Sequence, residues 1–301
     1  DSIMPNQMER RFEHNDDRNW AAALNLKYKH DFGRLRMEVK AGGQYRTKDR
    51  ANRWVRYMFE PAGSGRRPAL PGYYPLDNIE WEFRNGTYAK GSVGQLDYDA
   101  LEDIGAAYAM ARLSGSWGDV VFGVRGEHTH QGYTLLYPVN GSPDPAEGSQ
   151  RYWDILPSVN LKLTPAERMN VRADYFRSIN RPGFYEIVPY NIMGEEYTEL
   201  GNPDLRRARI DNVDLRWEWY PTDQDQVMAG FFYKHLKDPI EQAYYTINNR
   251  QSGFRPDNLG SADNWGFEVD LTKYVRHFGV KANYTYTHSA ITTSKSQNYT
   301  A

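Results

Sequence analysis

Apolar and polar residues alternate along most of this chain. The run over residues 35–41 places apolar side chains at every odd position and charged ones at every even position. Because successive side chains in a strand point to opposite faces, this period predicts strands with one apolar and one polar face. Ten such runs are predicted, over residues 24–28, 35–41, 101–113, 120–127, 153–162, 168–177, 212–219, 226–237, 264–271 and 280–287. Most lie near or above the 9 to 11 residues that cross a bilayer at a tilt, and no helix is strongly indicated.

The connections between these runs alternate between short and long. The short ones are tight polar or Gly/Pro turns at 31–33, 114–116, 164–167, 221–225 and about 275–278. The long ones are 47–100, 132–150, 178–208 and 238–262. Outer-membrane barrels show this asymmetry, with short periplasmic turns and long extracellular loops. The pattern favours an antiparallel transmembrane β-barrel over the alternative, a soluble carbohydrate-binding β-sandwich with two packed sheets.

The same alternation predicts which face each side chain occupies. We expect one continuous curved sheet with an apolar convex face and a polar concave face. The outward set is Leu26, Val39, Phe122, Val171, Leu215 and Val269, and the inward set is Lys27, Arg125, Arg172, Arg216 and Glu268. Residues 1–19 and 291–301 are both expected in extracellular loops. Ten strands would leave exposed edges in a membrane, so the native protein is expected to be longer.

Composition is compatible with this barrel and excludes several other classes. The mean hydropathy is −0.81, because the apolar and polar residues that alternate along each strand average to a polar value. Aromatic residues make up 14% of the chain, which is typical of the aromatic girdles at the two membrane interfaces of a barrel. The 37 basic and 39 acidic residues leave a net charge of −2, so no basic excess points to nucleic acid. The chain has no cysteine, which excludes disulfides and thiolate metal sites.

Several motifs bear a family resemblance. They are Arg-Pro at 181–182, Gly-Asn-Pro-Asp-Leu at 201–205, the pair Gly266 and Glu268, and Ala-Asn-Tyr-Thr at 282–285. In this order and spacing, the stretch from Glu102 onward resembles the C-terminal half of the barrel of TonB-dependent receptors, over about two thirds of the chain. The family often continues the second motif with a basic residue and Pro-Glu, whereas this chain has Arg206, Arg207 and Ala208.

The resemblance implies a fold and a function. Residues 1–301 would be about ten strands of a barrel of about 22, without the plug domain, the TonB box, the early strands and the C-terminal strands. The whole protein would lie in the bacterial outer membrane among its lipids and capture a scarce nutrient: a siderophore, cobalamin, an oligosaccharide or a peptide. Energy for import would come from the TonB complex through the plug. A passive porin or an adhesin barrel remains the alternative.

Candidate ligand contacts gather in two of the long connections. Arginine offers a planar fork for carboxylate or phosphate, and aromatic faces stack on rings, although the same residues could also pack a loop against itself. The candidates are Arg53, Trp54, Arg56, Tyr57, Arg66, Arg67, Tyr73, Tyr74 and Trp81 in 47–100, and Tyr185, Tyr190 and Tyr197 in 178–208. Both groups are expected at one mouth of the barrel.

Other residues are given structural roles or none. Arg181, Pro182, Asn202, Pro203, Gly266 and Glu268 are interpreted as fold markers. His128 and His130 share a strand face, but two imidazoles fall short of a metal site. Glu195 and Glu196 are adjacent and point to opposite faces in an extended chain. With no nucleophile motif or phosphate loop in the sequence, we expect no enzyme, no cofactor and no metal.

Overall fold

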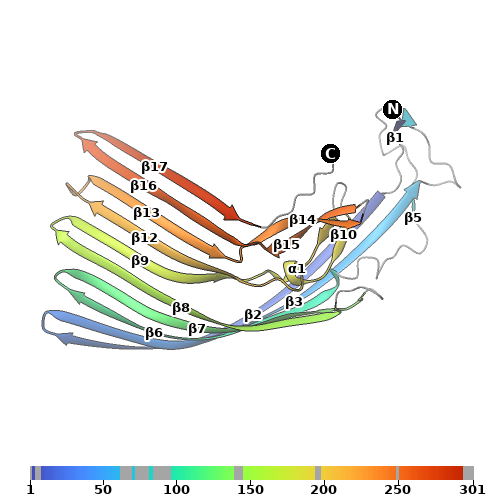
Figure 1. Ribbon diagram of the computed structural model, residues 1–301, viewed down its shortest axis with the longest axis horizontal. Helices are drawn as coiled ribbons and strands as arrows, with labels where there is room; N and C mark the ends of the chain where they lie inside the picture. The colour runs from blue at the N-terminus through green and yellow to red at the C-terminus, as the bar shows by residue number, and fades with distance from the viewer. Residues whose placement is uncertain are drawn as a thin grey trace.

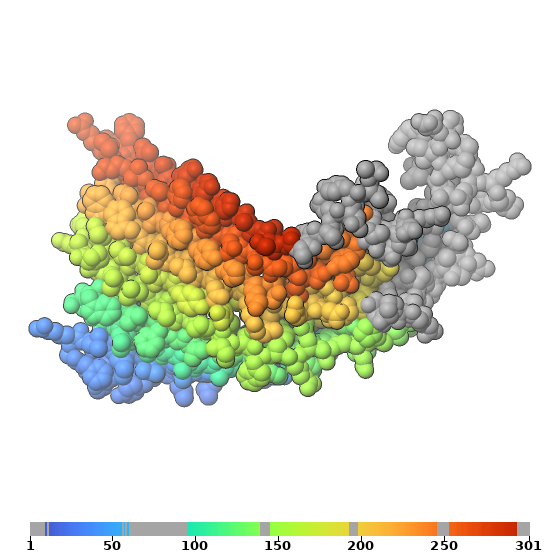
Figure 2. Space-filling view, viewed as in Figure 1, coloured from blue at the N-terminus to red at the C-terminus, as the bar shows by residue number. Residues whose placement is uncertain are grey.

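A computed structural model describes residues 2–3, 8–61, 70–71, 81–83, 96–138, 145–193, 198–248 and 251–293. Its main feature is a curved antiparallel sheet of ten long strands, each hydrogen-bonded to its neighbours in sequence (Figure 1). They are β2 (Met8–Phe32), β3 (Leu35–Pro61), β6 (Tyr98–Gly115), β7 (Gly118–Leu135), β8 (Glu147–Ala166), β9 (Met169–Asn180), β12 (Ala208–Trp219), β13 (Gln226–Lys237), β16 (Ser261–Val275) and β17 (Phe278–Thr292). Figure 2 shows them as successive bands of colour across the body of the molecule. The prediction of ten strands in one continuous antiparallel sheet is confirmed.

One end of the sheet carries only short turns, as the sequence predicts. Gly33 and Gly118 adopt positive φ values of 72° and 136° there. At Gly118 a Cβ atom would lie 1.9 Å from the carbonyl oxygen of Lys162, so this turn requires glycine. Arg168 and Arg276 take the left-handed conformation in two further turns.

The other end differs from the prediction, because the strands continue far past the expected boundaries. Residues 47–61 belong to β3 and residues 8–19 to β2, and the two strands pair as far as Met8 with Phe59. The predictions of a loop over 47–100 and of a terminal loop over 1–19 were therefore wrong for these segments. Above the membrane both faces of a strand meet water, so alternation fades while backbone pairing persists.

The connections at this end hold further short elements. The segment after β9 contains α1 (Phe184–Ile187), β10 (Asn191–Met193) and β11 (Thr198–Leu200), and the segment after β13 contains β14 (Ile240–Asn248) and β15 (Gln251–Asn258). These four strands form a separate sheet in the order β10-β11-β15-β14. The remaining pieces are β1 (Ser2–Ile3), β4 (Leu70–Pro71), which pairs with β1, and β5 (Trp81–Phe83), which pairs with β3. Within the described ranges, no helix has the length and hydropathy of a membrane span.

The strand register sorts the side chains into two faces. One row crosses all ten strands: Tyr28, Val39, Ala111, Phe122, Val159, Tyr175, Val213, Tyr233, Trp265 and His288. A row on the opposite face reads Asp31, Arg36, Ser114, Asp119, Lys162, Arg172, Arg216, Gly230, Glu268 and Thr285. By this register the expected outward and inward sets lie on opposite faces.

The polar face is the concave one. Phe184 of α1 lies under the side chains of Lys48 and Arg50, which stand on the polar face, with charge-to-ring distances of 5.5 and 5.7 Å. Figure 1 shows α1 inside the curve of the sheet. The facing prediction is therefore confirmed: apolar side chains cover the convex side, and Phe122 and Leu215 are exposed there.

Aromatic residues mark the upper limit of the apolar convex band. Trp20, Tyr45 and Trp153 are all exposed on this face. From Trp20 to Phe32 the chain rises about 40 Å, or about 30 Å along the barrel axis at a tilt of about 40°. This height equals the roughly 30 Å hydrocarbon thickness of a bilayer. Residues of β2 and β3 beyond Trp20 and Tyr45 therefore stand above the membrane core.

Candidate ligand-binding site

The segment between β9 and β12 folds back onto the concave face and is fixed there at its start by Arg181. Its guanidinium donates to Glu127 Oε2 at 2.5 Å and to Thr129 Oγ1 at 3.0 Å, both on β7. Gln131, also on β7, donates to the carbonyl of Pro182 at 2.8 Å. Glu127, Thr129 and Gln131 are buried. The loop therefore begins as an inward fold across the wall of the sheet.

The Asn-Pro turn fixes the middle of this segment to the β14–β15 hairpin. Asn202 donates through Nδ2 to the carbonyl of Pro256 at 2.8 Å, and its Oδ1 accepts from the backbone N–H of Asp204 at 3.1 Å across Pro203. At Gly201 a Cβ atom would lie 1.6 Å from the carbonyl oxygen of Val188, so the close approach requires glycine. The two inward-folded segments are held together by this turn.

The end of the segment fills a gap in the wall. β8 pairs with β9 only from Ser158 onward, just after Pro157, which has no N–H to donate. Arg207 closes the gap by donating to Asp154 Oδ2 at 2.5 Å and to the carbonyl of Trp153 at 3.2 Å. Its guanidinium also lies 4.1 Å from the ring centre of Tyr152. Arginine side chains thus anchor both ends of the folded segment to the β7–β8 hairpin.

Between these anchors lies an aromatic cavity of about 420 Å³, lined by Tyr185, Tyr190, Glu199, Gln242 and Phe254. The rings of Tyr185 and Tyr190 lie 4.3 Å apart, and the Tyr185 hydroxyl donates to Glu199 Oε2 at 3.2 Å. Burial raises the pKa of Tyr185 to about 12 and raises the pKa of Tyr190 as well. Both phenols therefore stay protonated and can donate hydrogen bonds at neutral pH.

The cavity rests on a small apolar cluster. Trp54, Leu96 and Tyr190 are buried together, and Ile192 packs against them. The backbone N–H of Trp54 donates to Asp97 Oδ1 at 2.9 Å, and Asn52 donates to the carbonyl of Leu96 at 2.6 Å. Among the described side chains of the first candidate group, Trp54 is the one that reaches the cavity, through Tyr190.

The residues around Trp54 do not form one surface with it. Because β3 is extended here, Arg53 and Tyr57 lie on the convex face, opposite to Trp54. Arg53 donates to Asp99 Oδ1 at 2.7 Å, and Tyr57 meets Phe12 edge-to-face at 5.8 Å. The expectation that this run converges on the mouth was therefore wrong for Arg53 and Tyr57.

Other sequence candidates have varied outcomes. Arg66, Arg67, Tyr73, Tyr74 and Tyr197, with Glu195 and Glu196, lie outside the described residues, and so do the side chains of Arg56 and Trp81. Gly266 is a close-packed position where a Cβ atom would lie 2.1 Å from the carbonyl oxygen of Tyr286. Glu268 forms an ion pair with Arg216 at 3.7 Å on the concave face. Sequence reasoning missed Glu199, Gln242 and Phe254, although the aromatic residues of the 238–262 connection were a usable signal.

The two histidines lie on the convex face with partners of their own. His128 packs against Trp153 with ring centres 4.9 Å apart, and His130 lies 3.8 Å from Asp103. In the part of the chain that the structure describes, no three His, Cys, Asp or Glu side chains are grouped to hold a metal ion.

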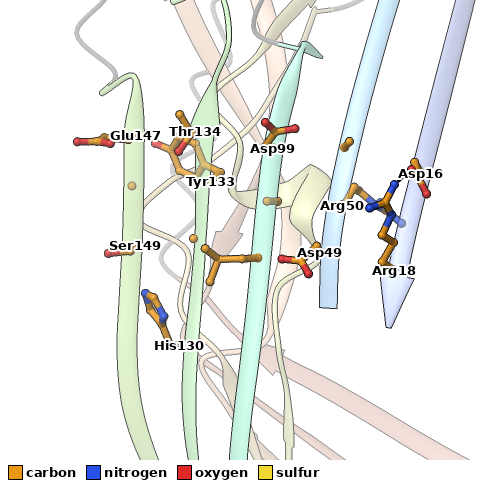
Figure 3. A pocket seen from close by; sticks show the side chains of 15 residues that line it. Asp16, Arg18, Asp49, Arg50, Asp99, His130, Tyr133, Thr134, Glu147 and Ser149 are labelled. Atoms are coloured by element: carbon orange, nitrogen blue, oxygen red, sulfur yellow. Dashed lines mark hydrogen bonds and ion pairs between the residues drawn. The ribbon is translucent and has the colours of Figure 1, made fainter. Parts of the chain in front are cut away.

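A second and larger hollow, of about 790 Å³, opens on the convex side of β2, β3, β6, β7 and β8 (Figure 3). In the close-up, α1 lies behind these strands. The hollow is thus separated from the aromatic cavity by the wall of the sheet.

A single curved antiparallel sheet with an apolar convex face, a charged concave face and inward-folded segments at one end defines part of an outer-membrane β-barrel. The chain belongs to the TonB dependent receptor-like, beta-barrel family, whose model matches residues 6–301. Its place is accordingly the outer membrane. The expected family resemblance and fold are confirmed.

Solved structures share this fold at low sequence identity. The siderophore receptor PiuA from Acinetobacter baumannii superposes with a TM-score of 0.59 and 14% identity, over 96% of this chain and 40% of that one. The copper transporter OprC superposes with a TM-score of 0.59 and 11% identity, over 94% of this chain and 39% of that one. The ferric-catecholate import receptor Fiu from K12 E. coli superposes with a TM-score of 0.58 and 15% identity, over 93% of this chain and 38% of that one. The chain therefore spans about two fifths of the length of these receptors.

Among curated proteins, a partial likeness exists to galactoside alpha-(1,2)-fucosyltransferase 1 of Lagothrix lagotricha. It is 26% identical over 147 residues, which cover 48% of this chain and 37% of the enzyme. The same enzyme from Saimiri boliviensis boliviensis matches to the same extent. Neither likeness reaches half of the chain, whereas the barrel family model covers nearly all of it.

Proposed function

We propose that the full-length protein is a receptor that captures a ring-bearing nutrient in the aromatic cavity and imports it with energy from the TonB complex. The observation that carries this proposal is the pair of tyrosine rings, Tyr185 and Tyr190, which lie 4.3 Å apart at an interplanar angle of 35° in a cavity on the concave side. The cavity lies at the end with long connections, which in outer-membrane barrels faces the cell exterior. A nutrient arriving from outside would meet it before the lumen.

The lining favours a particular ligand chemistry. Aromatic faces stack on flat or sugar rings, and Glu199 and Gln242 supply acceptors beside the tyrosine donors. Among the described lining residues there is no cation to offset a densely anionic ligand. Of the four nutrient classes that the family suggests, a neutral or cationic ring-bearing molecule, such as an oligosaccharide or an aromatic peptide, therefore fits better than a polyanionic iron chelate.

Uptake by living cells tests the receptor function. A strain lacking the gene is complemented with the full-length receptor, with an inactive-TonB background as the energy control. Radiolabelled maltooligosaccharide, an aromatic peptide and a ferric catecholate serve as the probes. We expect accumulation of a neutral probe only with both the receptor and TonB. Accumulation without TonB would instead identify a passive pore, and uptake of the ferric catecholate alone would overturn the proposed ligand class.

Binding by the purified receptor then tests the cavity. Tyr190→Ala removes one ring of the tyrosine pair and opens the cluster under it, whereas Tyr284→Ala alters an exposed tyrosine on β17 that does not line the cavity. Loss of a central aromatic contact should weaken affinity by about tenfold or more, and the β17 variant should change it little. Equal affinity in both variants, measured by calorimetry, would exclude the cavity as the site.

A further inference from the structure

The aromatic cavity lies between two inward-folded layers, and each layer contributes rings to it. One layer is the small sheet β10-β11-β15-β14, in which Glu199 on β11 pairs in register with Phe254 on β15 and projects from the same face. The other layer is α1 and the chain after it, which carry Tyr185 and Tyr190. In Figure 1, α1, β10, β14 and β15 are grouped at one end of the molecule. Three aromatic rings and one carboxylate therefore line the same space of about 420 Å³.

Negative charge surrounds the two tyrosines of this cavity. Burial raises the pKa of Tyr185 to about 12, and the charges of Glu199 and Glu13 act in the same direction. Burial also raises the pKa of Tyr190, helped by the neighbouring phenol and by the charges of Glu199 and Glu186. Glu13 contributes from the concave side of β2. A negative potential that holds protons on two phenols also attracts other cations.

The three carboxylates have no cationic partner among the residues that the structure describes. Each accepts a hydrogen bond from a neutral donor: an asparagine amide for Glu13 at 3.2 Å, a backbone N–H for Glu186 at 2.6 Å and a tyrosine hydroxyl for Glu199 at 3.2 Å. Lys48 and Arg50, the cations that pack against α1, are held by a fourth carboxylate on β2 at 3.2 and 2.6 Å. The charge at the cavity is therefore left for a ligand to balance.

The lining of the cavity restricts the kind of cation that it can hold. A metal ion needs several oxygen ligands around it, and within the described ranges no three His, Cys, Asp or Glu side chains are grouped in that way. The cavity offers one carboxylate, one amide and three aromatic side chains instead. Aromatic ring faces attract cations, and alkylated ammonium groups are the ions that cages of aromatic rings recognise. An organic ammonium group thus fits this lining.

We propose that the aromatic cavity binds the ammonium group of a ring-bearing nutrient, with Glu199 as its counter-ion and three aromatic rings around it. This inference rests on the proposed function and adds a positive charge to the ring that the cavity takes. Tyr185 positions the counter-ion, because its hydroxyl donates to Glu199 Oε2. Gln242 is left to bond the polar groups of the ring. The charge adds to the ring contacts, so a neutral ring-bearing molecule still binds, but more weakly.

A matched pair of ligands tests the charge in the wild-type receptor. The glucosides of choline and of 3,3-dimethylbutanol carry the same sugar ring and nearly the same shape, but only the first is positively charged. Calorimetry on the purified full-length receptor should give an affinity for choline glucoside that is about tenfold higher or more. Equal affinities would overturn this inference and leave the proposed capture of a ring in place. Binding of neither glucoside would overturn the inference as well, while the uptake assay still decides on the receptor function.

Removal of the counter-ion tests its assignment. Glu199→Gln keeps the side-chain shape and an acceptor for the Tyr185 hydroxyl, but it removes the charge. It should lower the affinity for choline glucoside by about tenfold and change that for the neutral glucoside little. The matched control is Glu147→Gln, which neutralises an exposed carboxylate at the same end of the barrel on the convex side. An equal loss for both glucosides in Glu199→Gln would show that Glu199 only shapes the cavity.

A second variant tests the aromatic rings without altering any charge. Phe254→Leu keeps an apolar side chain in the cavity and removes one ring face. It should lower the affinity for choline glucoside more than that for the neutral glucoside, because only the charged group gains from the ring electrons. Unchanged affinity for choline glucoside in both Glu199→Gln and Phe254→Leu would overturn the proposal.

Discussion

At the scale of single residues, the ion pair between Arg181 and Glu127 is one of the contacts that hold the segment between β9 and β12 folded inward. Both side chains are largely buried, with exposed fractions of 18% and 10%. Arg181→Ala removes one of the two arginine partners of Glu127 and leaves Arg125 at 2.6 Å, so the loss of stability should stay below the roughly 3 kcal/mol of breaking a buried pair completely. We expect the variant to lower the urea midpoint of the full-length receptor and to make the segment from 181 to 207 sensitive to protease. Replacing the exposed Arg18 in the same assay should change neither readout, and unchanged cleavage in Arg181→Ala would show that other contacts hold the segment.

A second residue-scale prediction concerns the short turn before β13. The Lys273 ammonium donates to Asp225 at 2.5 Å, the backbone N–H of Tyr274 donates at 2.8 Å, and these bonds hold the pKa of Asp225 below its ordinary range. A lowered folded-state pKa adds stability above the unfolded-state pKa of about 4, and this stability is lost as the pH falls through the folded-state value. Between pH 7 and pH 3, the wild-type urea midpoint should therefore fall more steeply than that of Asp225→Asn. Parallel curves would contradict this.

At the scale of elements, the extension of β3 above the membrane decides which side chains serve the site. Neighbouring residues point to opposite faces, so Trp54→Ala should weaken nutrient binding by about tenfold through the cluster under Tyr190. Arg53→Ala breaks the pair with Asp99 on the convex face and should leave the affinity unchanged. Titrating both full-length variants with the probe that the uptake assay identifies separates the two faces. A larger effect from Arg53→Ala would reverse the assignment.

The same element shows why the sequence predicts only part of the strands. Within the bilayer, Leu35, Met37 and Val39 face lipid and their charged neighbours face the lumen, so alternation marks the strand. Beyond the girdle, Asp49 and Arg50 stand on opposite faces that are both polar, and no alternation remains to show that pairing continues. Tyr185 and Tyr190 could be named as candidates, but Glu199 meets Phe254 through the parallel pair β11–β15. Local patterns do not encode such a long-range pairing.

At the scale of the whole molecule, the barrel wall separates three environments with one layer of strands. The convex band faces lipid, the concave face carries ion pairs such as Arg172 with Glu218 at 2.8 Å, and the upper wall bears the two cavities on opposite sides. The arrangement depends on alternation alone, because a strand has no other means of assigning neighbours to different environments. A charged residue introduced on the lipid-facing side should therefore lower the free energy of unfolding by a predictable amount, and the same residue on the lumen side should not.

The neighbours Val121 and Phe122 on β7 provide the sharpest test of this arrangement. Phe122 lies mid-band on the convex face, in the row with Val39 and Val159, whereas Val121 lies on the concave face between Arg112 and Asn160. An arginine facing lipid near the bilayer midplane costs about 2 to 4 kcal/mol, so Phe122→Arg should lower the free energy of unfolding by that amount in lipid vesicles. Val121→Arg enters the polar lumen face and should cost less than about 1 kcal/mol, since it meets no lipid. Reversible folding of the full-length barrel into vesicles gives both values. A larger penalty for Val121→Arg would mean that the lipid-facing side has been assigned to the wrong face.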